Sequence, residues 1–205
     1  MKKCEEFFRN NKPKFLFGIT DIRQLKEKND VMDVAFIGKS NVGKSSLINA
    51  ITNSKISISS KTAGRTREIN FFAIGDRLNF VDMPGYSFAL ASEEQREKWK
   101  NLICDYFAIS KNLKLVFLLV DCKKGLKGDD LDFMNMLDDL KISYQIILTK
   151  IDSINRFELD NVVIGVENEL KNHSLANENV LAVSSTKKYG IFEVMDRVWE
   201  LLKNN

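Results

Sequence analysis

Cysteine, proline and histidine are scarce in this chain. Its 205 residues include three cysteines, two prolines and one histidine. Cys4, Cys104 and Cys122 are odd in number and lack C-x-x-C spacing, which favours free thiols in a reducing compartment over a disulfide framework. His173 lies in the polar stretch KNHSLANEN and is expected at the surface. A metal site built from histidine and cysteine ligands is therefore excluded.

Long apolar runs are also missing. The longest run, near residues 113–120, has the length of a strand and contains Lys114, whereas a membrane span needs roughly 18 apolar residues. The N-terminus has no apolar stretch typical of a signal peptide. We therefore expect a soluble, cytoplasmic protein without a membrane partner.

A strong charge of one sign is absent as well, because the net charge is only +3. This argues against a dedicated nucleic-acid-binding protein, and no DNA partner is expected. Basic residues nevertheless gather at the N-terminus and in one later loop: Lys2, Lys3, Arg9, Lys12 and Lys14, then Lys55, Lys61, Arg65 and Arg67. Solvated surface and contact with RNA phosphates are both open interpretations of these groups.

From residue 34 onward, apolar runs alternate with helical patterns, which is typical of a parallel sheet with helices on both faces. Six strands are expected: Val34–Ile37, Ile69–Ala73, Leu78–Val81, Lys114–Val120, Tyr144–Leu148 and Val180–Val183. The short turn at Gly75 and Asp76 predicts that the second and third strands form an antiparallel hairpin at one edge. Helices are expected after Ser92, over about 129–140, over about 158–171 and from about 191. Residues 1–30 are predicted to be an extension packed on a single domain of residues 31–205.

The segment Gly38–Ser45, GKSNVGKS, fits the phosphate-loop pattern G-x-x-x-x-G-K-[ST], and it follows a strand and opens a helix as that pattern requires. Gly38 and Gly43 let the backbone wrap around phosphate groups, which the inward N–H groups and the positive end of the helix attract. Lys44 is expected to bridge the β- and γ-phosphates, and the Ser45 hydroxyl to ligate Mg²⁺.

A second phosphate-side segment, Asp82-Met-Pro-Gly85, follows the third strand. Asp82 would hold Mg²⁺ through water, and the Gly85 N–H would sense the γ-phosphate. Between the two segments lies the basic loop KTAGRTR, residues 61–67. Thr66 is our first choice there for a second hydroxyl ligand of Mg²⁺, and Thr62 is the alternative.

Guanine specificity is predicted by Thr149-Lys150-Ile151-Asp152, which follows a strand and fits [NT]-K-x-D. The Asp152 carboxylate can accept from N1–H and the exocyclic amine of guanine, and adenine presents neither donor, so adenine would leave it unpaired. Lys150 can cover the base, Thr149 can tie this loop to the phosphate loop, and a backbone N–H near Ser184 can donate to guanine O6. All these segments end strands, where an open α/β sheet binds its ligand.

The candidate GTP-binding residues are Gly38, Lys39, Ser40, Asn41, Val42, Gly43, Lys44, Ser45, Gly64, Arg65, Thr66, Arg67, Glu68, Asp82, Met83, Pro84, Gly85, Thr149, Lys150, Ile151, Asp152, Val183, Ser184 and Ser185. The candidate Mg²⁺ ligands are Ser45, Thr66 and, through water, Asp82. No catalytic base, nucleophile or arginine finger is assigned. Slow hydrolysis alone, accelerated by a partner, is expected, because catalysis in this class rests on positioning and charge stabilisation.

The chain resembles the EngB (YsxC/YihA) family of bacterial ribosome-biogenesis P-loop GTPases over nearly its whole length. The resemblance rests on GKSNVGKSSLINA at 38–50, KTAGRT at 61–66 with INFF at 69–72, DMPGYSFA at 82–89, TKID at 149–152 and SSTKKYG at 184–190. It implies a P-loop GTPase fold, GTP or GDP with Mg²⁺ as ligands, and a switch in assembly of the large ribosomal subunit through its rRNA and proteins. The family's link to cell division and septation is taken as indirect, and a monomer is the default.

Two residues qualify this resemblance, and a third adds a hypothesis. Tyr86 stands where many small GTPases place a water-orienting glutamine, and EngB-like proteins share this substitution. Something else must therefore position the water, and the ribosomal partner and a cation are two candidates. Ala63 replaces the proline usual in the family. Asn41 resembles the asparagine that binds K⁺ in some related GTPases, so K⁺ is a candidate second cofactor.

Three other functions stay open at this point. A GTP-gated rRNA-binding chaperone would explain the basic N-terminus and the loop at 61–67, with binding rather than turnover as the function. An ATPase or phosphotransferase would use the phosphate loop but leaves Thr149–Asp152 unexplained. GTPases of tRNA modification or ion transport share the motifs but normally carry further domains, which 205 residues do not accommodate.

Overall fold

The structure, a computed structural model, describes residues 3–26, 30–56, 68–86 and 92–204. Its centre is a seven-stranded sheet with the order β1-β3-β4-β2-β5-β6-β7. The strands are β1 (Pro13–Ile19), β2 (Met32–Gly38), β3 (Ile69–Ile74), β4 (Leu78–Asp82), β5 (Leu113–Asp121), β6 (Tyr144–Thr149) and β7 (Leu181–Ala182). The helices are α1 (Lys3–Asn10), α2 (Lys44–Thr52), α3 (Glu93–Ile109), α4 (Gly128–Asp139), α5 (Arg156–Leu170) and α6 (Ile191–Asn204).

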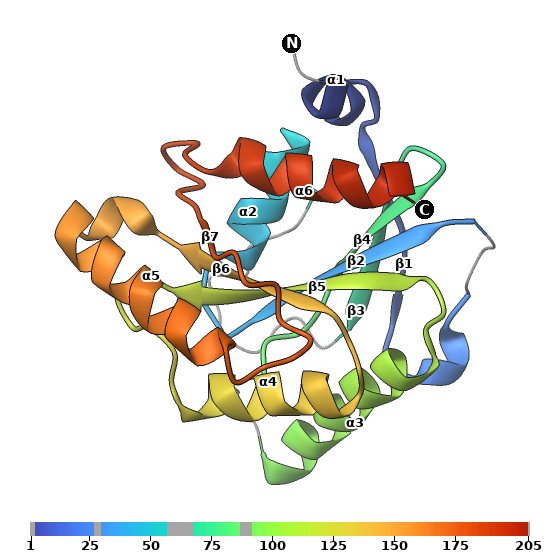
Figure 1. Cartoon of the computed structure of the whole chain (residues 1–205). Coiled ribbons are helices and arrows are strands. Elements are labelled where there is room, and N and C mark those ends of the chain that lie inside the picture. The colour runs from blue at the N-terminus through green and yellow to red at the C-terminus, as the bar shows by residue number, and fades with distance from the viewer. Residues whose placement is uncertain (1–2, 27–29, 57–67, 87–91, 205) are drawn as a thin grey trace.

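The central strands are buried on both faces. Every residue of β2 and of β6 is buried, and β5 is buried from Leu115 to Val120. Such continuous apolar runs suit parallel strands between two helical layers. Figure 1 shows α1, α2 and α6 on one side of the sheet and α3, α4 and α5 on the other. The predicted α/β fold with helices on both faces is confirmed.

Two apolar cores lie on the two faces of the sheet. Tyr106 of α3, Phe133 of α4 and Val166 of α5 belong to one core. Phe8 of α1, Leu47 of α2 and Val198 of α6 belong to the other. Because alternate residues of each strand face opposite sides, the neighbours Phe36 and Ile37 of β2 join different cores.

The predicted strand count and the predicted edge were wrong. The sheet has seven strands rather than six, and the β3–β4 hairpin is antiparallel as expected but lies inside the sheet. β1 forms the edge of the sheet next to this hairpin, because it pairs antiparallel with β3. The sequence of β1 gives a weak signal because Phe15 is 54% exposed and the register shifts between Phe15 and Phe17. Aromatic contacts hold the pair, with Phe17 stacked on Phe71 at 4.7 Å between ring centroids.

The expectation that His173 lies at the surface was also wrong. The residue is 6% exposed, and its Nδ1 lies 2.6 Å from Asp138 Oδ2 of α4. Glu169 of α5 approaches Nε2 at 3.6 Å, and the ring meets Tyr144 edge-to-face. Asp138 is hydrogen-bonded to one ring nitrogen and Glu169 lies near the other, so a polar sequence context conceals a buried histidine that joins α4, α5 and β6.

The helix predictions hold within a few residues. Ser92 caps α3 by accepting from Gln95 N at 3.3 Å, and α4 and α6 begin within one residue of the predicted positions. α5 begins at Arg156, two residues earlier than expected, because Asn155 and Glu158 form a capping box there. In the part of the chain that the structure describes, no helix combines the length and the apolar content required to cross a membrane.

Candidate nucleotide-binding site

The predicted segments meet at one edge of the sheet, where the parallel strands end. In the parallel pairing, Phe36 of β2 lies opposite Asp82 of β4, and Gly38 lies opposite Leu119 of β5. Asp121, the last residue of β5, lies opposite Thr149, the last residue of β6. This is the edge at which open α/β sheets bind ligands. The register therefore brings the phosphate loop, the Asp82 segment and the Thr149 segment together.

Close approaches explain both loop glycines. A Cβ at Gly38 would lie 2.7 Å from Leu119 O, so only glycine fits between the phosphate loop and β5. Gly43 has φ +106°, a left-handed conformation that glycine adopts without a steric penalty. α2 begins directly after it at Lys44, so the first N–H groups of a nine-residue helix face the loop. An anion at this place would meet free donors and the positive end of the helix.

Lys44 and Asp82 form a direct ion pair at the centre of the phosphate side. Their side chains are only 12% and 7% exposed. Gly85 is equally close to the loop, since a Cβ there would lie 2.9 Å from Gly38 O and 3.2 Å from Ser40 N. Met83 and Pro84, between Asp82 and Gly85, are buried. The Asp82–Gly85 segment is thus packed against the phosphate loop.

The oxygen donors near Lys44 fit Mg²⁺ in their chemistry. Ser45 provides a hydroxyl in the first turn of α2, and Asp82 provides a buried carboxylate at the end of β4. Mg²⁺ prefers oxygen ligands and is commonly held by one or two carboxylates together with substrate phosphates and water. Within the described ranges no group of three histidine, cysteine or acidic residues could hold a metal without a nucleotide. A site completed by phosphate oxygens is consistent with this donor set.

The Thr149–Asp152 loop is hydrogen-bonded to the phosphate loop. Thr149 Oγ1 donates to Val42 O at 2.6 Å, which is the tie expected of this residue. Lys150 has φ 60°, and its Nζ donates to Asn41 O and to Asp121 Oδ2, both at 2.7 Å. The lysine stem is thereby stretched between β5 and the phosphate loop.

Asp152 is oriented by two hydroxyl groups from the loop after β7. Ser184 Oγ donates to Asp152 Oδ1 at 2.5 Å, and Thr186 Oγ1 lies 3.4 Å from Oδ2. Ser184 is fully buried, and its oxygen also accepts from Lys187 N at 3.1 Å. The pKa of Asp152 is lowered from its ordinary value, first by the Ser184 hydrogen bond. An ionised, fixed acceptor is the form that guanine N1–H and its amine require.

The remaining candidates differ in their places. Val183 is buried, with its N–H on Leu148 O and its carbonyl on Ile151 N, so it supports the loop through its backbone. Ser185 is half-buried beside Ser184. Glu68 is exposed before β3, and its carboxylate lies beside Gly18 of β1 rather than at the phosphate loop. Gly64, Arg65, Thr66 and Arg67, together with Thr62, lie outside the described residues.

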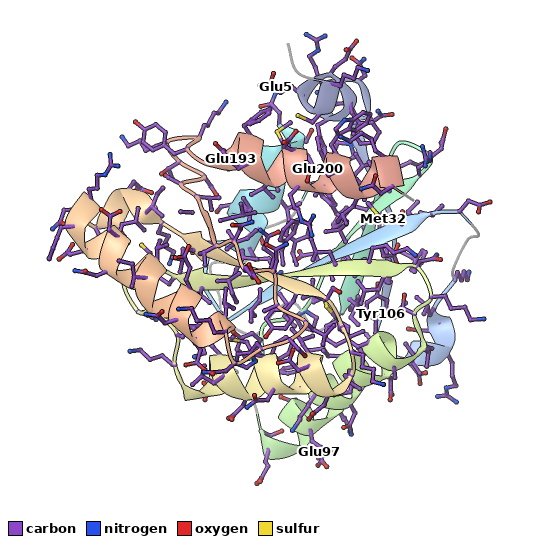
Figure 2. All side chains as sticks on the ribbon, in the orientation of Figure 1. Glu5, Met32, Glu97, Tyr106, Glu193 and Glu200 are labelled. Carbon is purple, nitrogen blue, oxygen red and sulfur yellow. The ribbon has the colours of Figure 1, made fainter. Side chains whose placement is uncertain are left out.

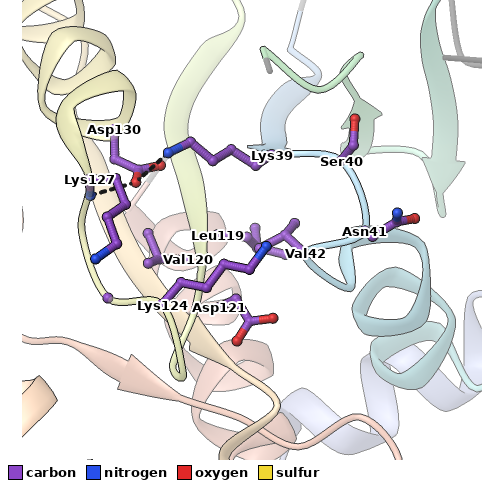
Figure 3. Close-up of a pocket in the computed structure, with 11 residues that line it drawn as sticks. Lys39, Ser40, Asn41, Val42, Leu119, Val120, Asp121, Lys124, Lys127 and Asp130 are labelled. Carbon is purple, nitrogen blue, oxygen red and sulfur yellow. Dashed lines mark hydrogen bonds and ion pairs between the residues drawn. The ribbon is translucent and has the colours of Figure 1, made fainter. Parts of the chain in front are cut away.

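Sequence reasoning missed Asp130, a buried carboxylate of α4 that joins both phosphate-side loops. Lys39 Nζ lies 2.9 Å from its Oδ2, as Figure 3 shows, and Lys127 N donates to the same oxygen at 2.8 Å. Tyr86 OH donates to Oδ1 at 2.5 Å, and the Tyr86 ring stacks on Phe133 at 4.6 Å. Burial and then the Asp130 hydrogen bond raise the pKa of Tyr86. In the sequence, Asp130 belongs to a pair of acidic residues in the first turn of a helix. Acidic residues are common at that position, so nothing marked this one as part of a site.

Asp121 was missed for a different reason. It ends β5 and accepts from Lys150, so it fixes the lysine of the base loop. Its only sequence signal is an acidic residue after a buried strand, next to Cys122. Figure 3 shows Asp121 near Lys124 on the loop that follows β5.

Comparisons with known proteins agree with this arrangement. The family described as 50S ribosome-binding GTPase matches residues 33–150, and the Elongation factor Tu GTP binding domain matches residues 106–204. A probable GTP-binding protein EngB of Caulobacter vibrioides is 43% identical over 173 residues, which cover 84% of this chain and 76% of that protein. The corresponding protein of Thermotoga maritima is 41% identical over 174 residues, covering 84% and 88%.

Solved structures show the same fold. A crystal structure of a probable GTP-binding protein engB has a TM-score of 0.67 and 24% identity, covering 84% of this chain and all of that one. Era in complex with MgGDPNP and nucleotides 1506–1542 of 16S ribosomal RNA has a TM-score of 0.65 and 24% identity, covering 85% of this chain and 56% of that one.

Proposed function

The chain belongs to the EngB family of GTP-binding proteins and is a GTPase, and we propose that it acts as a Mg²⁺-dependent switch during assembly of the large ribosomal subunit. The observation that carries the nucleotide part is the convergence of two loops. Lys44 and Asp82 lie at the phosphate loop, and Asp152 is held by Ser184 at the base loop, and Thr149 connects the two loops.

In this proposal, different residues bind the phosphates, the metal and the base. Lys44 and the N–H groups at the start of α2 bind the phosphates, and Ser45, Asp82 and Thr66 contribute to the Mg²⁺ site. When bound there, Mg²⁺ would neutralise negative charge on the nucleotide phosphates. Asp152 selects guanine, and Lys150 covers the base. Gly85, packed against Gly38 and Ser40, is placed to report the γ-phosphate to the segment that follows it.

A nucleotide titration tests the base site. Fluorescent GDP should bind in competition with GTP but not with ATP. Asp152→Asn should weaken GDP binding roughly a thousandfold, because the amide is uncharged and turns a second donor, its NH2 group, toward the guanine amine. The same variant should gain affinity for xanthosine diphosphate, whose C2 oxygen accepts from the new amide. Asp160→Asn, an exposed substitution on α5, serves as the matched control. Equal competition by ATP would contradict guanine specificity.

The ribosomal part of the proposal is supported by the family whose description is 50S ribosome-binding GTPase. The chain should co-sediment with large-subunit precursors when a GTP analogue is present and should dissociate from them when GDP is present. Removing the charges of Lys61, Arg65 and Arg67 should weaken that association, because backbone phosphates of rRNA attract cations. The Thr66→Ala variant separates the two parts, since it should lose GTP-dependent association while keeping GDP binding.

A GTP-gated rRNA-binding module is the second candidate, favoured by the N-terminal stretch, where Lys2, Lys3, Arg9, Lys12 and Lys14 outnumber Glu5 and Glu6. It differs from a turnover switch in one measurement. If a variant that binds GTP but hydrolyses it very slowly still completes one assembly cycle after another, binding is the function. If such a variant stays trapped on the particle, turnover is required.

A further inference from the structure

A groove with an apolar floor runs between α3 and α4. It has a volume of about 660 Å³, and its apolar lining includes Ile103, Phe133 and Met136. Ile103 and Phe133 are buried in its floor, and Tyr86 and Met136 are half-buried. A groove of this size and composition can hold the apolar side chains of another chain segment.

The rim of the groove is acidic. Four of the lining residues are carboxylates, Glu93, Glu97, Asp129 and Asp132, and one, Lys100, is a cation. Lys39 of the phosphate loop lies 3.5 Å from Asp129, so Glu93, Glu97 and Asp132 carry most of the negative charge of the rim. This balance stands against the net charge of +3 of the whole chain. An acidic rim repels the phosphates of RNA and attracts lysine and arginine.

The groove also connects to the nucleotide site. Tyr86 lines the groove and directly follows Gly85, which packs on Gly38 and Ser40. Asp130, between the groove residues Asp129 and Asp132, binds both the Tyr86 hydroxyl and Lys39 of the phosphate loop. A segment bound in the groove would therefore touch the residue that ties α4 to the phosphate side.

We propose that the groove between α3 and α4 docks a lysine- and arginine-rich protein segment with apolar anchors. The acidic rim selects the basic side chains, and the floor of Ile103, Phe133 and Met136 takes the anchors. Its contact with Tyr86 couples docking to the nucleotide state. The inference rests on the proposed function and deepens it, because it assigns this face to a basic protein of the assembling particle and leaves rRNA to the basic segments of the sequence at the N-terminus and at 61–67.

Peptide binding to the full chain tests the groove without a ribosome. The probe is a fluorescein-labelled peptide of alternating leucine and lysine, followed by fluorescence anisotropy. Glu97→Lys with Asp132→Lys should weaken it by at least about tenfold, because two attractions become repulsions. Glu193→Lys with Glu200→Lys makes the same charge change on α6, across the sheet in Figure 2, and should change binding by less than about twofold.

Several results would overturn the inference. Equal losses of peptide affinity in both double variants would show that the groove is not the binding site. Equal binding of a leucine–glutamate peptide would show that basic side chains are not selected, and undiminished binding of a serine–lysine peptide would show that apolar anchors are not needed. Displacement of the peptide by oligouridylate would mean that the groove binds RNA. A dimer that dissociates in the Glu97→Lys, Asp132→Lys variant would make a second copy the occupant. Unchanged GDP affinity and melting temperature show that both variants fold. If peptide binding is lost while ribosomal co-sedimentation persists, the groove is not the ribosomal docking site, whereas the GTP-dependent association itself stands.

Discussion

The two halves of the nucleotide site are held in different ways. On the base side, Asp152 and Lys150 are fixed by partners that belong to the site itself, namely Ser184, Asp121 and the phosphate loop. On the phosphate side, Tyr86 is fixed by Asp130 and Phe133 of α4, outside the nucleotide loops. A closed set of hydrogen bonds suits the recognition of a constant base. A contact with a surface helix suits the proposed switch, in which the segment after Asp82 moves with the state of the phosphates.

On the phosphate side, Lys44→Met is expected to have the largest effect. In the proposed function the Lys44 ammonium binds the phosphates, so GDP and GTP affinity should fall by roughly 100-fold, the equivalent of about 3 kcal/mol for a buried charge-assisted contact. Guanine selectivity, measured by the ratio of GDP to ADP affinity in the variant, should be preserved because the base side does not depend on Lys44. A loss of selectivity would show that the two halves are not separate. Lys55→Met is a suitable exposed control.

Gly85→Ala should separate binding from switching. The added Cβ would lie 2.9 Å from Gly38 O, so the segment after Asp82 has to move away from the phosphate loop. We expect the preference for GTP over GDP to fall by roughly tenfold, since the γ-phosphate contact is lost while the diphosphate contacts remain. Gly165→Ala on α5, where a Cβ would meet nothing within 4 Å, is the matched control. Unchanged GTP preference would contradict the role of Gly85.

Tyr86→Phe removes the hydroxyl that joins the phosphate side to α4 and keeps the ring that stacks on Phe133. Asp130 is 2% exposed and would lose one of its donors, so the free energy of unfolding should fall by about 1–3 kcal/mol. GDP affinity should change little, because Lys39 and Lys127 still hold Asp130. Denaturant unfolding and GDP titration check the two parts. Tyr189→Phe, on an exposed tyrosine, should leave both unchanged.

The sequence predicted most of the elements and the Thr149 hydrogen bond to the phosphate loop, but not the other contacts that join the elements. Strands such as Lys114–Val120 were found because they are buried on both faces, and the loops because their glycines and charges follow fixed spacing. β1 was missed since its outer side, including Phe15, faces solvent, so no strict alternation marks it. Asp130 and His173 were missed because a carboxylate at a helix start and a histidine in a polar stretch resemble surface residues. Only the fold shows that both are buried and paired.

Ser184→Ala should have the smallest effect, and it sharpens the base side of the comparison. In the folded protein the Ser184 hydroxyl lowers the pKa of Asp152. The carboxylate therefore stays ionised down to a lower pH than an ordinary aspartate does. Without that donor the folded pKa rises, and protonation removes the acceptor for guanine at a higher pH. At neutral pH we expect only a several-fold loss of GDP affinity, because Asp152 is ionised in both proteins and Thr186 remains nearby. The pH at which GDP binding is half lost should move upward in Ser184→Ala relative to the unchanged chain.

Ser46→Ala, at an exposed position of α2, should leave that pH where it was. A parallel fall of affinity at every pH would mean that Ser184 only supports the loop and does not tune Asp152.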